Sequence, residues 1–127
     1  MDKLRTFVVE DNPMLLEQLC GFLVEGAPVD IVGSADSEQH ALAWLRDSAN
    51  TCDVILIDIF LKAGTGLGVL KGIVDLPHHA KRVVVLSNYA TPEMRQRSDE
   101  LGADKVFDKS SEIDELLAWF NELRLPL

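Results

Sequence analysis

Asp53-Val54-Ile55-Leu56-Ile57-Asp58 is the stretch of this 127-residue chain that decides its fold. Its four central residues are all apolar, without the polar alternation of a strand that has one face in water. A strand of this kind is buried on both faces, as the central strands of parallel sheets are. The stretch ends on a carboxylate, and a glycine-rich loop at 63–66 follows it shortly afterwards. It therefore predicts a central parallel strand that carries an acidic side chain at its carboxyl end.

Similar short apolar runs occur on both sides of this stretch and alternate with amphipathic segments. The expected strands cover residues 6–9, 30–35, 53–58, 82–87 and 105–107. Four of the intervening segments have recognisable helix starts, which are Pro13, Asp36 with Gln39 as a capping box, Thr91 followed by Pro92, and Ser110 or Ser111. Five strands alternating with five helices predict an α/β fold, a doubly wound parallel sheet with helices on both faces.

The composition bounds the class of protein. Apolar residues make up 47% of the chain, enough for one core, and we expect a single domain over residues 1–127. The net charge of −9 argues against a general binder of nucleic acid or of anionic membranes. Cys20 and Cys52 have no ligand spacing and are expected to be reduced. Without a signal-peptide pattern or a run of 18 apolar residues, we expect a cytoplasmic protein.

Side chains that can carry chemistry follow the ends of four of the five expected strands. They are Glu10 and Asp11 after the first strand, Asp58 at the end of the third, Ser87 at the end of the fourth and Lys109 after the fifth. Doubly wound sheets place their sites at these carboxyl ends, so we expect the five side chains to meet at one edge. Each alone has an ordinary explanation, such as a helix-capping acid or a surface lysine, but chance placement of all five at one edge is improbable.

The chemistry of this set follows from its charges. Three clustered carboxylates favour a hard divalent cation, and Mg²⁺ suits one or two of them together with water and phosphate oxygens. A carboxylate held near Mg²⁺ is a nucleophile for a phosphoryl group. The cation and Lys109 would neutralise the phosphoryl oxygens, and Ser87 would donate a hydrogen bond to one of them. The sequence therefore predicts an Mg²⁺-dependent phosphoryl-transfer site with Asp58 as the acceptor.

The chain resembles the receiver domains of bacterial two-component response regulators, in particular single receivers like those of chemotaxis. The motifs that carry the resemblance run from end to end of the chain: Glu10-Asp11, Ile55-Leu56-Ile57-Asp58, Gly66, Leu86-Ser87, Gly102-Ala103-Asp104 and Asp108-Lys109. The resemblance implies a flavodoxin-like strand order, 2-1-3-4-5. It also implies a signalling switch rather than a turnover enzyme.

The resemblance implies roles for individual residues as well. Asp58 would take a phosphoryl group from the phosphohistidine of a sensor histidine kinase or a histidine phosphotransfer protein. Asp11 and Asp58 would ligate Mg²⁺ directly, Glu10 mainly through water, and the backbone carbonyl of Phe60 would be a further ligand. Ser87 would move toward the phosphoryl group, and Lys109 would pair with it.

Several positions depart from the family pattern. The aromatic residue that usually stands three residues before the lysine is replaced by Val106, and Phe107 should point to the opposite side of the strand. The usual coupling between hydroxyl and aromatic is therefore in doubt. Lys62 stands where proline is usual. Ser110 replaces the proline that usually follows the lysine, which favours a trans bond after Lys109.

Three larger residues flank the expected phosphate site. Asn88, beside the switch hydroxyl, stands where a small residue is usual and would narrow the access to the phosphate. Phe60 and Tyr89 are bulky, and our hypothesis is that they exclude the water that hydrolyses the phosphate.

The sequence does not decide how a receiver of this kind would pass on its signal. It also leaves two other functions to be weighed, a phosphohydrolase and a flavin-binding electron carrier. A stand-alone receiver would signal to a downstream protein, or form a homodimer, through the fourth helix, fifth strand and fifth helix. A receiver cut from a longer DNA-binding regulator is the alternative, although nothing basic follows Leu127 and this chain itself is not expected to touch nucleic acid. An Mg²⁺-dependent phosphohydrolase would need an acid where Phe60 stands. A flavin carrier would need a phosphate-binding loop where Glu10 and Asp11 would repel phosphate.

Overall fold

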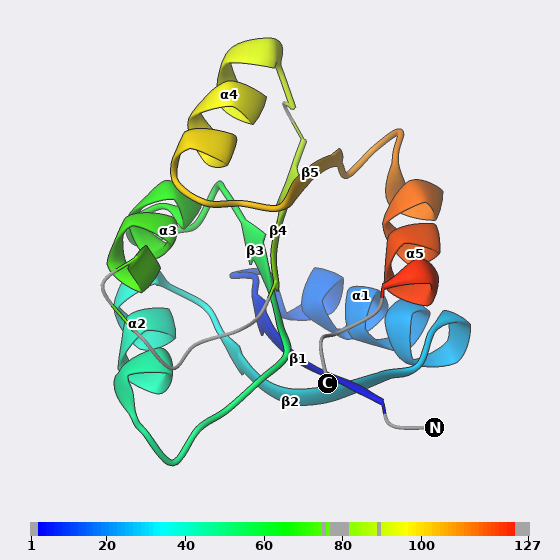
Figure 1. Cartoon of the computed structure of the whole chain (residues 1–127), viewed down its shortest axis with the longest axis horizontal. Coiled ribbons are helices and arrows are strands. Elements are labelled where there is room, and N and C mark those ends of the chain that lie inside the picture. Colours follow the sequence, from blue (N-terminus) through cyan, green and yellow to red (C-terminus); the bar gives the residue numbers. More distant parts are fainter. Residues whose placement is uncertain (1–2, 75, 77–81, 89, 124–127) are drawn as a thin grey trace.

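Five strands alternate with five helices in the part of the chain that the structure, a computed structural model, describes: residues 3–74, 76, 82–88 and 90–123. The elements are β1 Leu4–Val9, α1 Pro13–Gly26, β2 Val29–Ala35, α2 Glu38–Arg46, β3 Val54–Asp58, α3 Gly66–Val74, β4 Arg82–Ser87, α4 Pro92–Glu100, β5 Lys105–Asp108 and α5 Ile113–Glu122. The strands form one parallel sheet in the order β2-β1-β3-β4-β5 (Figure 1). The predicted fold class and strand order are confirmed.

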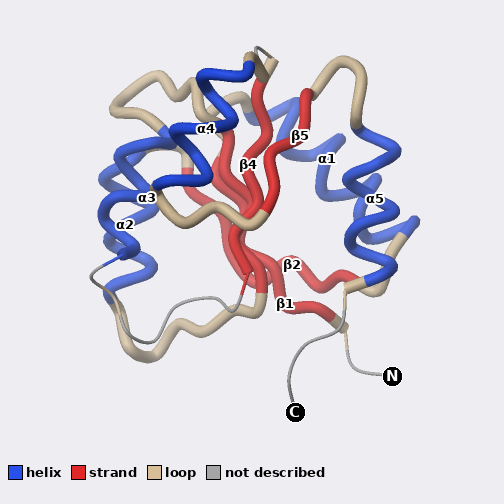
Figure 2. The backbone as a smooth tube through the Cα atoms, turned by 45° about the horizontal axis from the view of Figure 1, so that its top comes forward, coloured by secondary structure: helices blue, strands red, loops and turns tan. Residues whose placement is uncertain are grey.

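The helices cover both faces of the sheet. Helices α1 and α5 lie on one side, and α2, α3 and α4 lie on the other (Figures 1 and 2). Alternate residues of each strand supply the two cores. Phe7 and Val9 of β1 lie in the core beneath α2 and α3, whereas Leu4 and Val8 lie in the core beneath α1 and α5.

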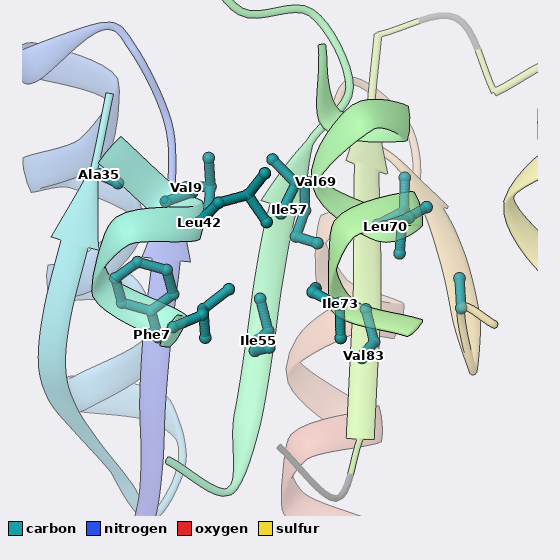
Figure 3. Close-up of a cluster of buried hydrophobic side chains, with 14 of the residues drawn as sticks. Phe7, Val9, Ala35, Leu42, Ile55, Ile57, Val69, Leu70, Ile73 and Val83 are labelled. Carbon is teal, nitrogen blue, oxygen red and sulfur yellow. The ribbon is translucent and has the colours of Figure 1, made fainter. Parts of the chain in front are cut away.

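Strand β3 is the centre of this arrangement, as its sequence predicts. All five of its residues are buried, and it pairs with β1 on one side and β4 on the other. Figure 3 shows Ile55 and Ile57 facing residues of α2 and α3, including Leu42 and Val69. The odd-numbered side chains thus serve one core, and the even-numbered Val54 and Leu56 serve the other.

Two of the predicted helix starts are confirmed. Pro13 is the first residue of α1, behind Asn12, whose side chain accepts hydrogen bonds from the N–H groups of Met14 and Leu15. Thr91 caps α4, and its hydroxyl oxygen accepts the Met94 N–H at 3.2 Å. Each cap satisfies N–H groups that the first turn of a helix leaves without a partner.

The predicted cap of α2 was wrong by one residue. Ser37 is the cap, and its hydroxyl oxygen accepts the His40 N–H at 3.1 Å. Asp36 instead contacts the ring of His40, with 2.7 Å between Oδ1 and Nδ1. Asp36 and Ser37 are both good capping residues, and the turn of the backbone decides between them.

The predicted cap of α5 was also wrong. The helix begins at Ile113, and Glu112 before it makes no capping bond with its side chain. The N–H groups of Ser110 and Ser111 donate to Oδ1 of Asp108 instead, at 2.8 and 3.2 Å. The two serines therefore belong to a turn that Asp108 organises.

Three further features bear on the sequence predictions. Cys20 and Cys52 are free thiols, both partly exposed. The residues that the structure describes contain no cis peptide bond, so the bond after Lys109 is trans as predicted. Within the same residues, no helix combines the length and the apolar character that crossing a membrane requires.

Candidate functional site

The backbone brings four strand ends to one edge of the sheet. The N–H of Glu10 donates to the Ala35 carbonyl at 3.0 Å, one residue beyond the end of β1. The N–H of Lys109 donates in the same way to the carbonyl of Ser87, at 2.9 Å. The backbone hydrogen bonds of the sheet therefore continue one residue beyond β1 and β5. They fix the backbone positions of Glu10 and Lys109 at this edge.

Three carboxylates converge at this edge. Glu10, Asp11 and Asp58 each offer one oxygen, and these oxygens lie within 4.8 Å of one another. Glu10 and Asp58 are only 2% and 7% exposed, whereas Asp11 is half-buried. Backbone N–H groups hold two of the carboxylates. Asn12 donates to Oε2 of Glu10 at 3.2 Å, and Phe60 donates to Oδ1 of Asp58 at 3.1 Å.

Lys109 joins two of these carboxylates. Its Nζ lies 2.8 Å from Oδ2 of Asp58 and 2.5 Å from Oε1 of Glu10. Burial lowers the pKa of Lys109, but the hydrogen bonds to Asp58 and Glu10 outweigh it, so the pKa stands above its usual value and the ammonium stays charged. Burial raises the pKa of Glu10 more than Lys109 lowers it, and the neighbouring charge of Asp58 adds to the rise.

The charges of the site fit a divalent cation. With all groups ionised, three carboxylates and one ammonium leave two negative charges in a confined space. Mg²⁺ binds through one or two carboxylates and keeps several waters, so it does not need an enclosed protein cage. The cluster of Glu10, Asp11 and Asp58 could therefore hold a metal ion.

The loop after β3 forms one wall of the site. Phe60 pairs with Thr65 in an isolated antiparallel bridge and is 51% exposed. Gly66 packs directly against the end of β3, because a Cβ there would collide with the carbonyl oxygen of Asp58 and lie 2.7 Å from Cα of Ile59. The glycine thus lets α3 start immediately behind the acidic residue.

Sequence reasoning missed the residue that holds this loop. Glu38, the first residue of α2, accepts the N–H of Thr65 at 3.0 Å, and its own N–H donates to the carbonyl of Ala63 at 3.1 Å. Cβ atoms at Gly64 or Gly68 would meet its side chain. Glu38 and Thr65 are 27 residues apart, so no local pattern in the sequence points to their contact.

The departures from the family pattern are partly settled by the structure. Val106 packs toward the core beneath α2 and α3, and Phe107 lies in the opposite core, as predicted. Asn88 is exposed and lines a hollow of about 410 Å³ together with Glu10, Lys109 and residues of α1. Lys62 is exposed on the loop. Tyr89 lies outside the described residues.

Comparisons with known proteins identify the family and the fold. The family model described as the response regulator receiver domain matches residues 6–121. Among curated proteins, the transcriptional regulatory protein CitB of Klebsiella pneumoniae is 32% identical over 87 residues, which is 68% of this chain and 36% of CitB. The chain spans between 14% and 55% of the length of the first curated relatives that it matches.

Solved structures show the same fold. The signal receiver domain of NarL from Mycobacterium tuberculosis is 26% identical, with a TM-score of 0.77 and 93% of each chain covered. A response regulator from Burkholderia pseudomallei, solved with a phosphorylated aspartic acid, a calcium ion and citrate, is 26% identical with a TM-score of 0.74, and the match covers 95% of this chain and 68% of that one. From the family match and the shared fold, the chain belongs to the response regulator receiver domain family.

Proposed function

We propose that this chain is the phosphoacceptor of a two-component signalling system, with Asp58 as the residue that takes the phosphoryl group. The observation that carries the proposal is the contact of Lys109 with both Asp58 and Glu10, inside a cluster of three carboxylates. A lysine so placed lowers the negative charge of the site. Phosphorylation then shifts the loop after Ser87 together with α4 and β5 between two arrangements.

The transfer follows from the groups present. A carboxylate oxygen of Asp58 attacks the phosphorus of a phosphohistidine, the P–O bond forms, and the P–N bond breaks. The electron pair of that bond stays on the imidazole nitrogen, which takes up a proton. Lys109, 2.8 Å from the acceptor carboxylate, offsets the negative charge of the incoming phosphoryl oxygens. Ser87, fully buried at the end of β4, is the proposed hydrogen-bond donor to one of them.

The proposed cofactor is Mg²⁺. Asp11 and Asp58 would bind it directly, Glu10 through water, and the backbone carbonyl of Phe60 would complete the protein ligands. When bound, the cation supplies positive charge to the phosphoryl oxygens. The Burkholderia pseudomallei relative was solved with a phosphorylated aspartic acid and a calcium ion, and the presence of both in a protein of this fold supports the proposal.

The proposed partners follow from the family. The donor is a sensor histidine kinase or a histidine phosphotransfer protein, and the receiver acts in the cytoplasm as a switch rather than a turnover enzyme. The output is a downstream protein, or a homodimer formed through α4, β5 and α5. CitB, 36% of which the chain spans, is a transcriptional regulator, so output through DNA would depend on sequence outside residues 1–127. The net charge of −9 disfavours direct binding of DNA by this chain.

Phosphorylation by a small donor tests the proposal. The protein is incubated with Mg²⁺ and acetyl phosphate, and its intact mass is measured. We expect an adduct of one phosphoryl group that is stable in acid and labile in base, and no adduct in Asp58→Asn. An adduct of equal yield in Asp58→Asn would refute the proposal, and sustained turnover of the donor over many cycles would favour a phosphohydrolase.

We also propose that Phe60 slows the hydrolysis of the phosphate. Phe60 is 51% exposed, and its N–H donates to the acceptor carboxylate, so its ring would limit the approach of water. Phe60→Asn is expected to lose its phosphoryl group faster than the wild type in the same intact-mass assay. An equal or slower loss would contradict the role.

A further inference from the structure

Arg95 of α4 makes three hydrogen bonds to three separate segments. Its Nε donates to the carbonyl of Ala90 at 3.0 Å, and Nη1 donates to the carbonyl of Val106 at 2.8 Å. Nη2 donates to the carboxylate of Glu112 and forms an ion pair with it. One half-buried guanidinium therefore ties the loop after β4 to β5 and to the residue before α5. We refer to these contacts as the Arg95 clamp.

The clamp connects to the candidate site through the backbone. Ala90 lies three residues after Ser87. On the other side, Glu112 accepts the N–H of Asp108 at 2.9 Å, and Asp108 directly precedes Lys109. The N–H of Lys109 in turn donates to the carbonyl of Ser87 at 2.9 Å. These hydrogen bonds link the clamp to Lys109 and, through the N–H of Lys109, to Ser87.

The chemistry of the guanidinium suits a two-state contact. Its donors are fixed in one plane and the group is always protonated, so the geometries of its three hydrogen bonds depend on one another. The bond to Glu112 joins two charged groups, a stronger class than neutral hydrogen bonds. Arg95 holds the pKa of Glu112 below its usual value, and the N–H of Asp108 contributes to the same effect.

Val106, one of the residues that Arg95 contacts, stands at a position that matters for signalling in related receivers. Val106 stands where related receivers carry an aromatic residue, and it has no ring to change rotamer with the state of Ser87. Its backbone carbonyl is instead one of the three acceptors of Arg95. Strand β5 lies between α4 and α5 in both views of the molecule (Figures 1 and 2), and the clamp joins α4 to β5 and to the residue before α5.

We propose that Arg95 is the positioning residue through which the phosphorylation state of Asp58 reaches the surface formed by α4, β5 and α5. The proposal rests on the function proposed above. A movement of Ser87 toward the phosphoryl group displaces the backbone at Ala90 and alters the bond from Nε. The guanidinium then changes its hold on Val106 and Glu112, and the start of α5 responds.

A phosphoryl mimic tests the proposal without turnover. Beryllofluoride is added with Mg²⁺, and amide chemical shifts are followed at the acidic edge and, separately, in α4, β5 and α5. In the wild type we expect both groups of amides to shift. In Arg95→Gln we expect the shifts at the acidic edge to remain and those in β5 and α5 to lose most of their size.

Two further variants separate coupling from folding. Glu112→Gln keeps the shape of its side chain but loses the charge, and Arg95→Lys keeps the charge but loses the planar fork, so both should reproduce the loss even where Arg95→Gln does not fold. Arg97→Gln is the matched control, because Arg97 is an exposed arginine on the same helix, and it should respond like the wild type.

The outcomes distinguish the two proposals. Full shifts in β5 and α5 of Arg95→Lys and Glu112→Gln, with the mimic bound, would overturn the role of Arg95 and leave the phosphoacceptor function intact. A lack of any mimic-dependent shift in the wild type, with none appearing at Asp58, would overturn the proposed function and the role of Arg95 with it.

Discussion

Lys109 shows how much of the site depends on a single side chain. Its ammonium reaches Glu10, which is only 2% exposed, and Asp58 on a different strand. A buried carboxylate that loses its partner is costly, because neither water nor another charge compensates it. The lysine therefore stabilises the fold as well as serving the proposed chemistry.

Replacing this lysine should lower stability. In the absence of Mg²⁺, Lys109→Gln is expected to reduce the free energy of unfolding by about 1–3 kcal/mol, less than for a fully enclosed pair because the Lys109 side chain keeps 15% of its surface exposed. Urea denaturation measures the change. Lys105→Gln, at an exposed lysine of β5, is the control and should stay within about 0.5 kcal/mol of the wild type. Equal stability of the two variants would show that the ion pairs contribute nothing.

Asp108 offers a prediction that depends on pH. The hydroxyl and the N–H of Ser110 lower the pKa of Asp108 to about 2 from its usual 3.8. Because the folded-state pKa lies below the unfolded value, these bonds stabilise the protein fully above about pH 4, and the contribution is lost as the pH falls through about 2. An NMR titration of the carboxyl carbon should show the low midpoint. In Ser110→Ala, which keeps the N–H, the midpoint should move up toward 3.8; an unmoved midpoint would mean that the Ser110 hydroxyl is not the cause.

Among the contacts between secondary-structure elements, the one between β3 and α3 positions the site. Gly66 lets the helix begin against the backbone of Asp58 and Ile59, where a Cβ has no room. By contrast, a Cβ at Gly21 of α1 would meet nothing within 4 Å. Packing therefore requires a glycine at position 66, whereas it leaves room for a larger residue at position 21.

Alanine substitutions at the two glycines should have opposite signs. Gly66→Ala is expected to lower the free energy of unfolding by about 1–3 kcal/mol, since the helix or the strand must move. Gly21→Ala is expected to raise it by about 0.5–1 kcal/mol through the better helix propensity of alanine. Thermal and urea unfolding of both variants check the signs. A stabilising Gly66→Ala would contradict the close packing behind Asp58.

The whole molecule should respond to the cation that the acidic edge is proposed to bind. A ligand that binds only the folded state stabilises it by about 1.4 kcal/mol at ten times its dissociation constant. Mg²⁺ is therefore expected to raise the melting temperature. The cause is relief of the repulsion among Glu10, Asp11 and Asp58, and no new surface is buried. Asp11→Asn should lose most of this rise. A rise of the same size in Asp11→Asn would place the cation elsewhere.

The fold and the candidate site were predictable from the sequence for a common physical reason. Buried parallel strands are apolar on both faces, so their ends are visible in the sequence, and in a doubly wound sheet those ends meet. Asp58 and Lys109 were found in this way. The roles of Glu38 and Arg95 were not, because their partners Thr65 and Glu112 lie 27 and 17 residues away and only the folded chain brings them together. The cap of α2 was predicted wrongly because Asp36 and Ser37 are equally good candidates, and the cap of α5 because Asp108 holds Ser110 and Ser111 in a turn.

The central claim is that the phosphoryl group is transferred to Asp58 and to no other carboxylate at this edge of the sheet. After reaction with Mg²⁺ and acetyl phosphate, borohydride reduces an acyl phosphate to an alcohol, so a phosphorylated aspartate becomes homoserine. Peptide mass spectrometry then locates it. We predict homoserine at position 58 alone, and only when the donor is present. Homoserine at position 11, a reduced glutamate at position 10, or no reduced residue in a protein that carries the phosphoryl mass would contradict the account.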